Sequence, residues 1–135
     1  MPFREKSAWV MAAIIAITAG LYAAMVGTLP SAVPALPVVI GFVVALAILS
    51  VFGQIAIAVL SPKDANAAAD ERDRQVTQRA SSIAGTVLTC GVVLALGTYV
   101  IGHGGSVMFH AVFASLIVAQ FCEYALTIWF YRRGV

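Results

Sequence analysis

Glu123 is the residue whose type and position most suggest chemistry, because a carboxylate inside an apolar helix is costly unless it is paired, protonated or in contact with water. It lies in the last long apolar stretch, and the eight residues between it and Tyr131 correspond to about 12 Å along a helix. Gln120 precedes it by one helical turn, and Gln54 lies about 9 Å from the end of the second apolar stretch. Together these residues form a candidate intramembrane polar site.

This site has three interpretations. A Glu123 that titrates or binds an ion would serve a proton- or cation-linked carrier. A protonated Glu123 bonded to Gln54 or to a hydroxyl would instead hold helices together. In the third interpretation the side chain reaches out to the membrane surface. A carrier needs several polar groups to bind, couple and release its cargo, and the apolar stretches offer few of them, which favours the structural interpretation.

Residues that bind metals or catalyse are otherwise scarce. His103 and His110 are seven residues apart and would share one helix face, so one chain does not supply both axial ligands of a haem, and only a haem shared between two copies stays open. Cys90 and Cys122 lie in apolar stretches without CxxC spacing and are expected to be buried apolar side chains. HExxH, P-loop and GxSxG motifs are absent from the sequence. We therefore expect no enzyme activity, no cofactor and no metal.

The elements that position these residues are membrane spans. Of the 135 residues, 61% are hydrophobic and only 10% are charged, whereas a soluble domain carries about 25% charged residues. A domain of this size does not bury so much apolar surface inside itself, so lipid must cover the rest. Four stretches are long enough to cross a bilayer, at about 8–29, 37–60, 80–101 and 107–131.

The charges predict how these spans are oriented. All eight Lys and Arg residues lie in the N-terminal tail, in the 61–79 loop or in the C-terminal tail, and the turns near 30–37 and 102–106 carry none. The positive-inside rule therefore predicts that both termini are cytoplasmic. Trp9, Trp129 and Tyr131 lie at the same ends, where an aromatic belt is expected. The two halves share this layout, which leaves a two-hairpin repeat open.

The 61–79 loop holds more than half of the formal charges of the chain. Asp64 or Asn66 could cap a helix that begins at 67–69 and continues through the third span to 101, with Asp70 and Arg74 forming a surface pair. The loop mixes both signs of charge and lacks a basic stripe, so we expect no direct binding of nucleic acid. Its charged run is a candidate partner-binding surface: Asp70, Glu71, Arg72, Asp73 and Arg74.

Small residues recur at four-residue spacing in the first and fourth spans, which permits close approach of helix backbones. In the first span a second small-residue row lies beside the first, which is more than one helix contact needs. We therefore expect a homo-oligomer or a larger membrane complex. The candidate packing residues are Ala12, Ala16, Gly20, Ala24, Ala111, Ser115 and Ala119.

Three short segments resemble a family of small bacterial and archaeal membrane proteins that has four predicted spans and no assigned activity. They are Phe3-Arg4-Glu5-Lys6-Ser7-Ala8-Trp9, the run from Asp70 to Arg74, and Tyr131-Arg132-Arg133-Gly134. The resemblance implies the membrane half of a gene pair with a small helix-turn-helix regulator. The charged run and the two tails would then form a cytoplasmic docking face.

These observations predict an all-α fold: a four-transmembrane-helix bundle over residues 1–135, a single integral membrane domain with both termini cytoplasmic and a cytoplasmic helical extension before the third span. We expect it in the bacterial inner membrane, in contact with lipid and with a cytoplasmic protein partner. The leading hypothesis is a non-catalytic accessory, scaffolding or regulatory subunit. The alternative is a small proton- or cation-linked transporter centred on Glu123.

Overall fold

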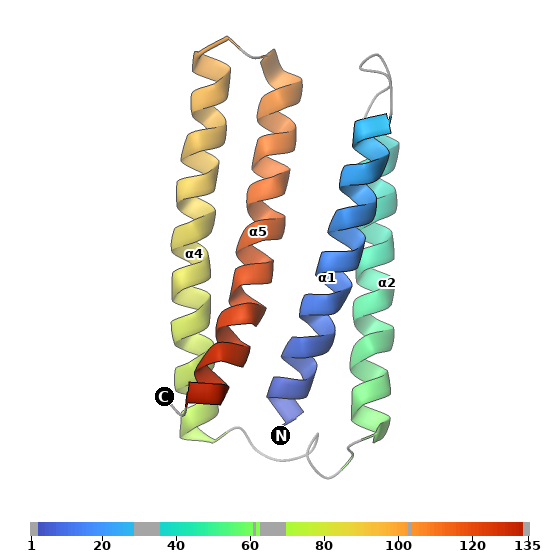
Figure 1. Ribbon diagram of the computed structural model, residues 1–135, viewed down its shortest axis with the longest axis vertical. Coiled ribbons are helices and arrows are strands. Elements are labelled where there is room, and N and C mark those ends of the chain that lie inside the picture. The colour runs from blue at the N-terminus through green and yellow to red at the C-terminus, as the bar shows by residue number, and fades with distance from the viewer. Residues whose placement is uncertain (1–2, 29–35, 61, 63–69, 103, 134–135) are drawn as a thin grey trace. The chain divides into compact units, whose positions relative to one another are not determined.

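A computed structural model describes residues 3–28, 36–60, 62, 70–102 and 104–133. These ranges contain four long helices, labelled as in Figure 1: α1 (Phe3–Thr28), α2 (Leu36–Leu60), α4 (Glu71–Val100) and α5 (Gly104–Arg133). The predicted all-α fold with four long apolar helices is confirmed. Each of the four is long and apolar enough to cross a membrane.

The chain divides into two compact units, residues 1–68 and residues 69–135. The first contains α1 and α2, and the second contains α4 and α5, so each half of the sequence forms one antiparallel helical hairpin (Figure 1). That all 135 residues act as a single membrane domain stays a prediction.

The α1–α2 hairpin is held by both polar and apolar contacts. Ser7 and Gln54 donate to each other: the Ser7 hydroxyl to the Gln54 Oε1 at 3.0 Å, and the Gln54 Nε2 to the Ser7 hydroxyl at 2.8 Å. Toward the other end, the rings of Tyr22 and Phe42 have centroids 5.4 Å apart. Between them the helices approach closely at Gly53, where an added Cβ would lie 2.9 Å from the Ile14 Cδ1.

The second hairpin begins at a well-defined helix cap. Asp70 is the N-cap of α4: its carboxylate accepts the backbone N–H of Glu71 at 2.7 Å, and Asp73 returns the contact by accepting the N–H of Asp70 at 3.4 Å. Such a capping box satisfies backbone donors that a helix start leaves unpaired. The prediction of a helix from 67 to 101 is therefore wrong at its start, because α4 begins at Glu71. Asp64 and Asn66, the predicted caps, lie outside the described residues.

The turn between α4 and α5 depends on one glycine. The N–H of Ile101 reaches the carbonyl of Gly97 and the N–H of Gly102 that of Tyr99, each at 3.1 Å. Gly102 then has a φ of +91°, a conformation that costs glycine little and most other residues more. The turn expected near 102–106 is shorter than predicted, because α5 already begins at Gly104; His103 lies outside the described residues.

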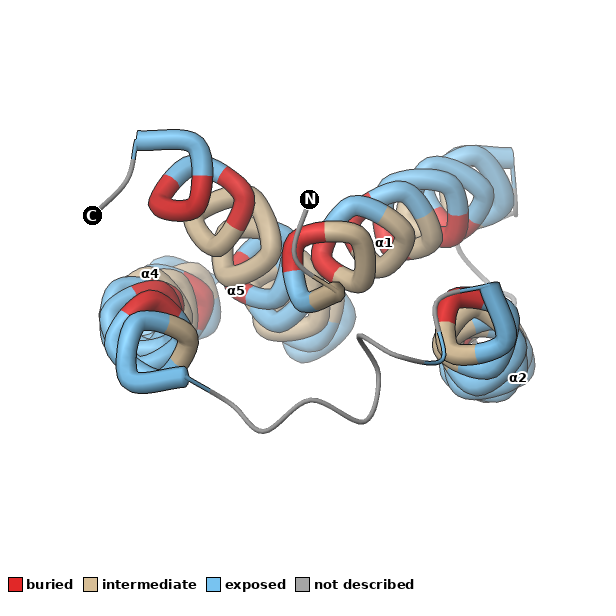
Figure 2. The backbone as a smooth tube through the Cα atoms, turned by 90° about the horizontal axis from the view of Figure 1, so that it is seen from below, coloured by how far each residue is buried: buried red, intermediate tan, exposed pale blue. Residues whose placement is uncertain are grey.

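The two helices of this hairpin pack through small side chains. Near its open end Val76 and Ala80 of α4 form an apolar cluster with Phe130 and Tyr131 of α5. Further along, a Cβ added to Gly91 would lie 2.6 Å from the Ser115 Oγ, so the backbones are close there. Figure 2 shows the buried residues of α4 on the side turned to α5.

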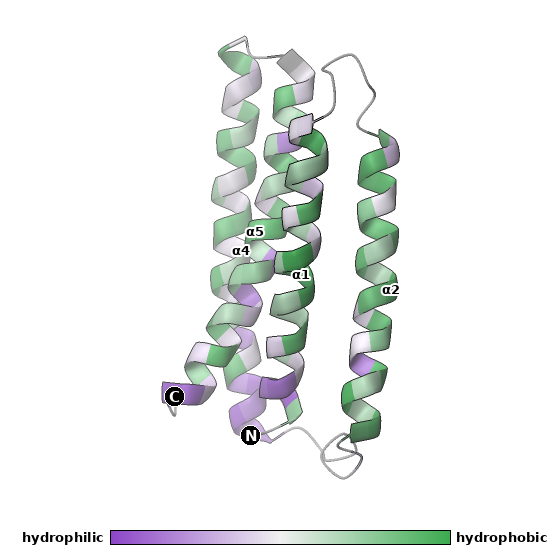
Figure 3. Cartoon of the chain, turned by 45° about the vertical axis from the view of Figure 1, so that its right-hand side comes forward, coloured by the Kyte–Doolittle hydropathy of each residue, from purple (hydrophilic) through white to green (hydrophobic). Residues whose placement is uncertain are grey.

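Outside these contact stripes the helices are apolar and exposed. Most of α2 is exposed (Figure 2), and its exposed side chains include Ile48, Phe52 and Val59. Figure 3 shows hydrophobic residues along most of each helix, with the hydrophilic ones gathered mainly toward helix ends. Such surface is stable only in contact with lipid or with other apolar helices. The chain is a multi-pass membrane protein, and its α4 and α5, with 30 residues each, measure about 45 Å, more than the roughly 30 Å hydrocarbon core.

Candidate functional site

The excess length of the second hairpin forms a feature that we call the polar base: residues 70–79 at the start of α4 with Tyr131–Arg133 at the end of α5. The first ten residues of α4, Glu71–Ala80, are largely polar and correspond to about 15 Å of helix. Within this hairpin, all the Lys and Arg residues lie in the polar base.

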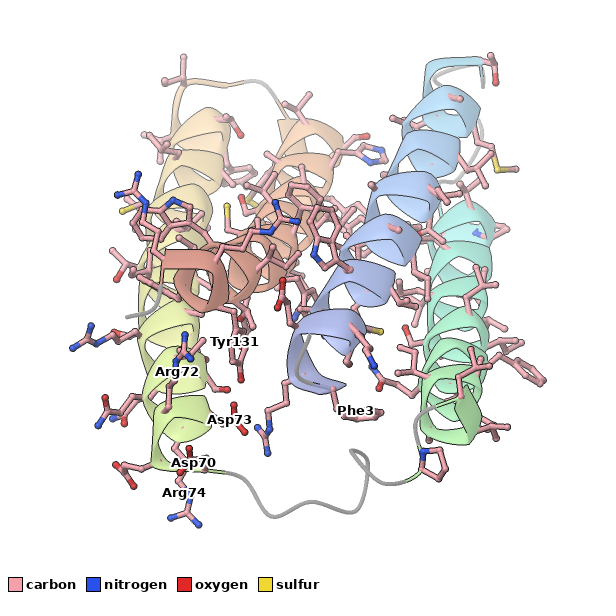
Figure 4. The ribbon with its side chains drawn as sticks, turned by 60° about the horizontal axis from the view of Figure 1, so that its bottom comes forward. Phe3, Asp70, Arg72, Asp73, Arg74 and Tyr131 are labelled. Carbon is pink, nitrogen blue, oxygen red and sulfur yellow. The ribbon has the colours of Figure 1, made fainter. Side chains whose placement is uncertain are left out.

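Asp73 and Tyr131 fasten the two helices of the polar base together. The Tyr131 hydroxyl donates to the Asp73 Oδ1, while the Oδ2 of the same carboxylate completes the capping box. Arg72 adds to this contact, because its Nη2 donates to the Tyr131 carbonyl at 3.2 Å and its guanidinium lies 5.9 Å from the centroid of the Tyr131 ring. Figure 4 shows Tyr131 extending from α5 toward Asp73 and Arg72. Together these contacts fix the start of α4 against the end of α5.

Other charged residues of the charged run face outward. Asp70, Glu71 and Arg74 are all exposed, and Figure 4 shows Asp70 and Arg74 away from the contact with Tyr131. At the end of α5, the Arg133 guanidinium lies 4.5 Å from the centroid of the Trp129 ring. Five predicted partner-binding residues thus divide into a pair that holds the hairpin (Arg72, Asp73) and three that present charge to the surroundings.

The helix register locates Glu123 relative to the polar base. Asp73 contacts Tyr131, and Gly91 contacts Ser115. Glu123 is midway between Tyr131 and Ser115 in the sequence, so it lies about level with Ser82, which is midway between Asp73 and Gly91. That level is only about 5 Å, one helical turn, from the level of Arg79. Among the three interpretations, this register favours a carboxylate near the membrane surface.

The contacts of Glu123 are local. Its side chain is half-buried, and its Oε2 accepts the Nε2 of Gln120 at 3.3 Å. Gln54, the third member of the candidate polar site, lies in the other compact unit and is bonded to Ser7. The structure therefore brings Gln120 and Glu123 together, and it gives Gln54 a hydroxyl partner that the sequence did not single out.

Only the first residue of the small-residue row of α1 is buried. Ala12 is buried, whereas Ala16, Gly20 and Ala24 are exposed. A four-residue step turns a helix by about 400°, so such a row drifts by about 40° per step. The buried stripe of α1 instead follows steps of three and four: Glu5, Ala8, Ala12, Ile15, Thr18 and Tyr22.

In α5 the small-residue row stays closer to its partner helix. Ala119 is buried, and Ala111 and Ser115 are half-buried. Ser115 is the member in contact with Gly91, and its hydroxyl donates to the Ala111 carbonyl at 2.8 Å. The hydroxyl is thereby satisfied within its own helix, which leaves its Cβ side as a small surface for close packing.

Residues that could bind metals are dispersed. No group of three or more His, Cys, Asp or Glu side chains with metal-binding geometry occurs among the described residues. His110 contacts the ring of its neighbour Phe109. Cys90 is exposed and Cys122 is half-buried, and both are free thiols.

Two features of the polar base escaped the sequence analysis. The Asp73–Tyr131 contact joins residues 58 positions apart, and only the helix pairing brings them together. The capping box did carry a signal, since Asp70 is followed three residues later by a second acidic side chain, a spacing typical of helix starts.

Comparisons with known proteins identify the family. No curated protein and no solved structure shows significant similarity to the chain. One family model, described as "Predicted membrane protein (DUF2178)", matches residues 4–135. The match covers nearly the whole chain and agrees with the resemblance carried by the start, the charged run and the end of the sequence. The chain belongs to this family of membrane proteins of unknown function.

Proposed function

We propose that the protein is a non-catalytic accessory, scaffolding or regulatory subunit that binds a protein partner through its polar base. The observation that carries the proposal is the fastening of Asp73 and Arg72 to Tyr131, which holds a charged, capped helix start in one place. A surface ordered before binding loses less conformational entropy when it binds. The polar base thus has the rigidity that a docking surface needs.

The charges of the polar base suit a protein partner. Asp70 and Glu71 provide negative charge and Arg74 positive charge within about one helical turn, and all three are exposed. Mixed charges of this kind favour an opposite pattern on a partner and disfavour uniformly charged surfaces. Four membrane crossings place the start of α1 and the end of α5 on one side, and the positive-inside rule assigns that side to the cytoplasm. The proposed partner is therefore a cytoplasmic protein or the cytoplasmic part of a membrane protein.

A charge exchange would test this proposal. In the double variant Glu71→Arg/Arg74→Glu the net charge of the base is unchanged and only the positions of the charges differ. Tagged wild-type protein, extracted gently from its own membrane, should retain a second protein in native mass spectrometry, and the exchanged variant should lose it. The parent single variants Glu71→Gln and Arg74→Gln should each weaken retention partially.

The fold of the exchanged variant needs a separate control. Neither side chain takes part in the Asp73–Tyr131 contact, and an arginine near a helix N-terminus costs only about 0.3–1 kcal/mol. Its thermal unfolding should therefore stay close to that of the wild type. A wild-type sample without any second protein, or equal retention by the exchanged variant, would refute the proposal.

The transporter centred on Glu123 has weaker support. Its carboxylate lies about one helical turn from the level of Arg79, and its side-chain partner is Gln120 on the same helix. A carrier predicts that Glu123→Gln abolishes a proteoliposome flux and leaves the fold intact. A flux lost in this way, in a protein that binds no partner, would favour the carrier over the subunit.

A further inference from the structure

A cavity of about 550 Å³ lies on the α4–α5 hairpin where the polar base meets the membrane span. Its polar lining comes from Gln75, Gln78, Arg79 and Ser82 on α4, and its apolar lining from Ile83 on α4 and Phe130 on α5. All six residues belong to the same compact unit. The cavity is therefore amphipathic, and its lining extends from the polar base to Ser82 and Ile83 at the start of the span.

The polar groups of this cavity have unused hydrogen-bonding capacity. Among the residues that the structure describes, Arg79, Gln75 and Gln78 have no hydrogen-bond or ion-pair partner, although all three line the cavity. Among the described residues that line the cavity, Arg79 is the only charged one and none is acidic. The cavity thus offers one guanidinium and two amides to a ligand with negative charge.

The position of the cavity selects a lipid as its ligand. Arg79 is the last charged residue of α4 before the apolar part of the helix begins at Ala80. A guanidinium at that depth lies at the level of the phosphate groups of the leaflet, and basic pockets beside membrane helices bind anionic headgroups. Ile83, which is 43% exposed, continues from this site toward the span, along the path of an acyl chain, whereas Phe130 is buried in the apolar cluster at the polar base.

We infer that this cavity binds an anionic phospholipid, with Arg79 and the two glutamines holding its phosphate and Ile83 contacting its first methylene groups. A zwitterionic headgroup fits less well, because none of the described lining residues supplies a carboxylate for its ammonium group. Arg79 and the two glutamines belong to the polar base, but Glu71 and Arg74, the charges exchanged in the test of the proposed partner, do not line the cavity. The inference does not depend on whether a protein partner exists.

Lipid titration of the full-length protein tests the inference. Delipidated protein in detergent would be titrated with phosphatidylglycerol and with phosphatidylcholine of the same acyl chains, and bound lipid counted by native mass spectrometry. The wild type should bind the anionic lipid at least about fivefold more tightly, the preference that one basic residue near the surface provides. In Arg79→Gln this preference should disappear.

Arg74→Gln is the matched control, because Arg74 is an exposed arginine on the same helix that does not line the cavity. It should retain the preference for the anionic lipid. Gln78→Glu is a second variant that keeps Arg79 and places an acid in the cavity, and it should lose the preference as well. If Arg79→Gln does not fold, the lipid preference of Gln78→Glu decides whether the inference stands.

Two results would overturn the inference. One is equal binding of the two lipids by the wild type, and the other is an equal loss of preference in Arg79→Gln and Arg74→Gln, which would indicate general attraction to positive charge. Competition with glycerophosphoglycerol, the headgroup without acyl chains, separates a lipid from a free phosphate compound. Displacement of the lipid at equal concentrations would assign the site to a soluble anion and refute the lipid assignment.

Discussion

Gly91→Ala is expected to destabilise the α4–α5 hairpin. A Cβ at this position would lie 2.6 Å from the Ser115 Oγ and 2.7 Å from the Ser115 Cβ. Ordinary contacts of a Cβ begin at 3.4 Å, so the atoms would need to separate by about 0.8 Å. Ser115 has little freedom to yield, because its Cβ is fixed to the backbone and its hydroxyl is bonded to the Ala111 carbonyl.

The magnitude follows from two opposing terms. Overpacking of a close contact costs about 1–3 kcal/mol. Alanine is favoured over glycine in a helix by up to about 1 kcal/mol, which offsets part of this cost. We expect a net loss of about 1–2 kcal/mol, which changes the ratio of folded to unfolded protein by a factor of about 5–30.

Unfolding in mixed micelles measures this loss. The helix content would be followed by far-ultraviolet circular dichroism during titration with a denaturing detergent. Gly85→Ala on the same helix is the matched control, since no atom lies within 4 Å of its added Cβ. This control should be as stable as the wild type or slightly more stable.

A second substitution tests the cause of the effect. Ser115→Gly removes both atoms that the new Cβ would meet, so the double variant Gly91→Ala/Ser115→Gly should regain stability, with a coupling of about 1 kcal/mol or more. If Gly91→Ala matches Gly85→Ala in stability, the two helices do not approach as closely as described, and the reasoning fails. A destabilised Gly91→Ala that Ser115→Gly does not rescue would show that the cost arises elsewhere.

Three further substitutions have smaller or more local effects. Tyr131→Phe should reduce the unfolding free energy of the polar base by about 1–2 kcal/mol, because the hydrogen bond to Asp73 is lost. Tyr99→Phe, at an exposed site of the same hairpin, should leave the unfolding free energy unchanged. Equal thermal unfolding of the two variants would contradict this prediction. Asp70→Ala should lower the unfolding free energy by about 1 kcal/mol by removing the N-cap, and Asp70→Asn, which can still cap the helix, should keep most of the stability. Faster amide hydrogen exchange confined to the first turn of α4 would show the loss of the cap. Gly53→Ala should cost less than about 1 kcal/mol, because the nearest atom to the added Cβ is the end of the Ile14 side chain and the second, Val10 Cγ1, lies at 3.1 Å. A loss as large as that of Gly91→Ala would contradict this reasoning.

The helices could be predicted well because each rests on a long run of local sequence. The predicted second span, 37–60, differs by one residue from α2, Leu36–Leu60, since Pro37 suits a first helical turn and the apolar run ends at Leu60. The start of α4 was placed too early because Asp64, Asn66 and Asp70 are all residue types that cap helices. Residue type alone does not choose among them, whereas the reciprocal contact between Asp70 and Asp73 does.

The candidate polar site could be predicted only as a set of residues. The sequence pointed to Glu123, Gln120 and Gln54 because polar groups are rare in apolar stretches. It did not supply the partner of Gln54, since the contact with Ser7 spans 47 positions. A hydrogen bond of that kind depends on how two helices are aligned, and many alignments satisfy the same apolar pattern.

The sequence by itself determined that this protein has four membrane helices and where its charges gather, because lipid requires apolar stretches long enough to cross it and makes charge within them costly. Only the tertiary structure decided which side chains meet. The alignment of α4 with α5 places Tyr131 on Asp73 and Gly91 against Ser115, and it thereby brings Glu123 near the level of the polar base. Helix alignment depends on the fit of a few small residues and on hydrogen bonds between distant positions, which local composition does not encode.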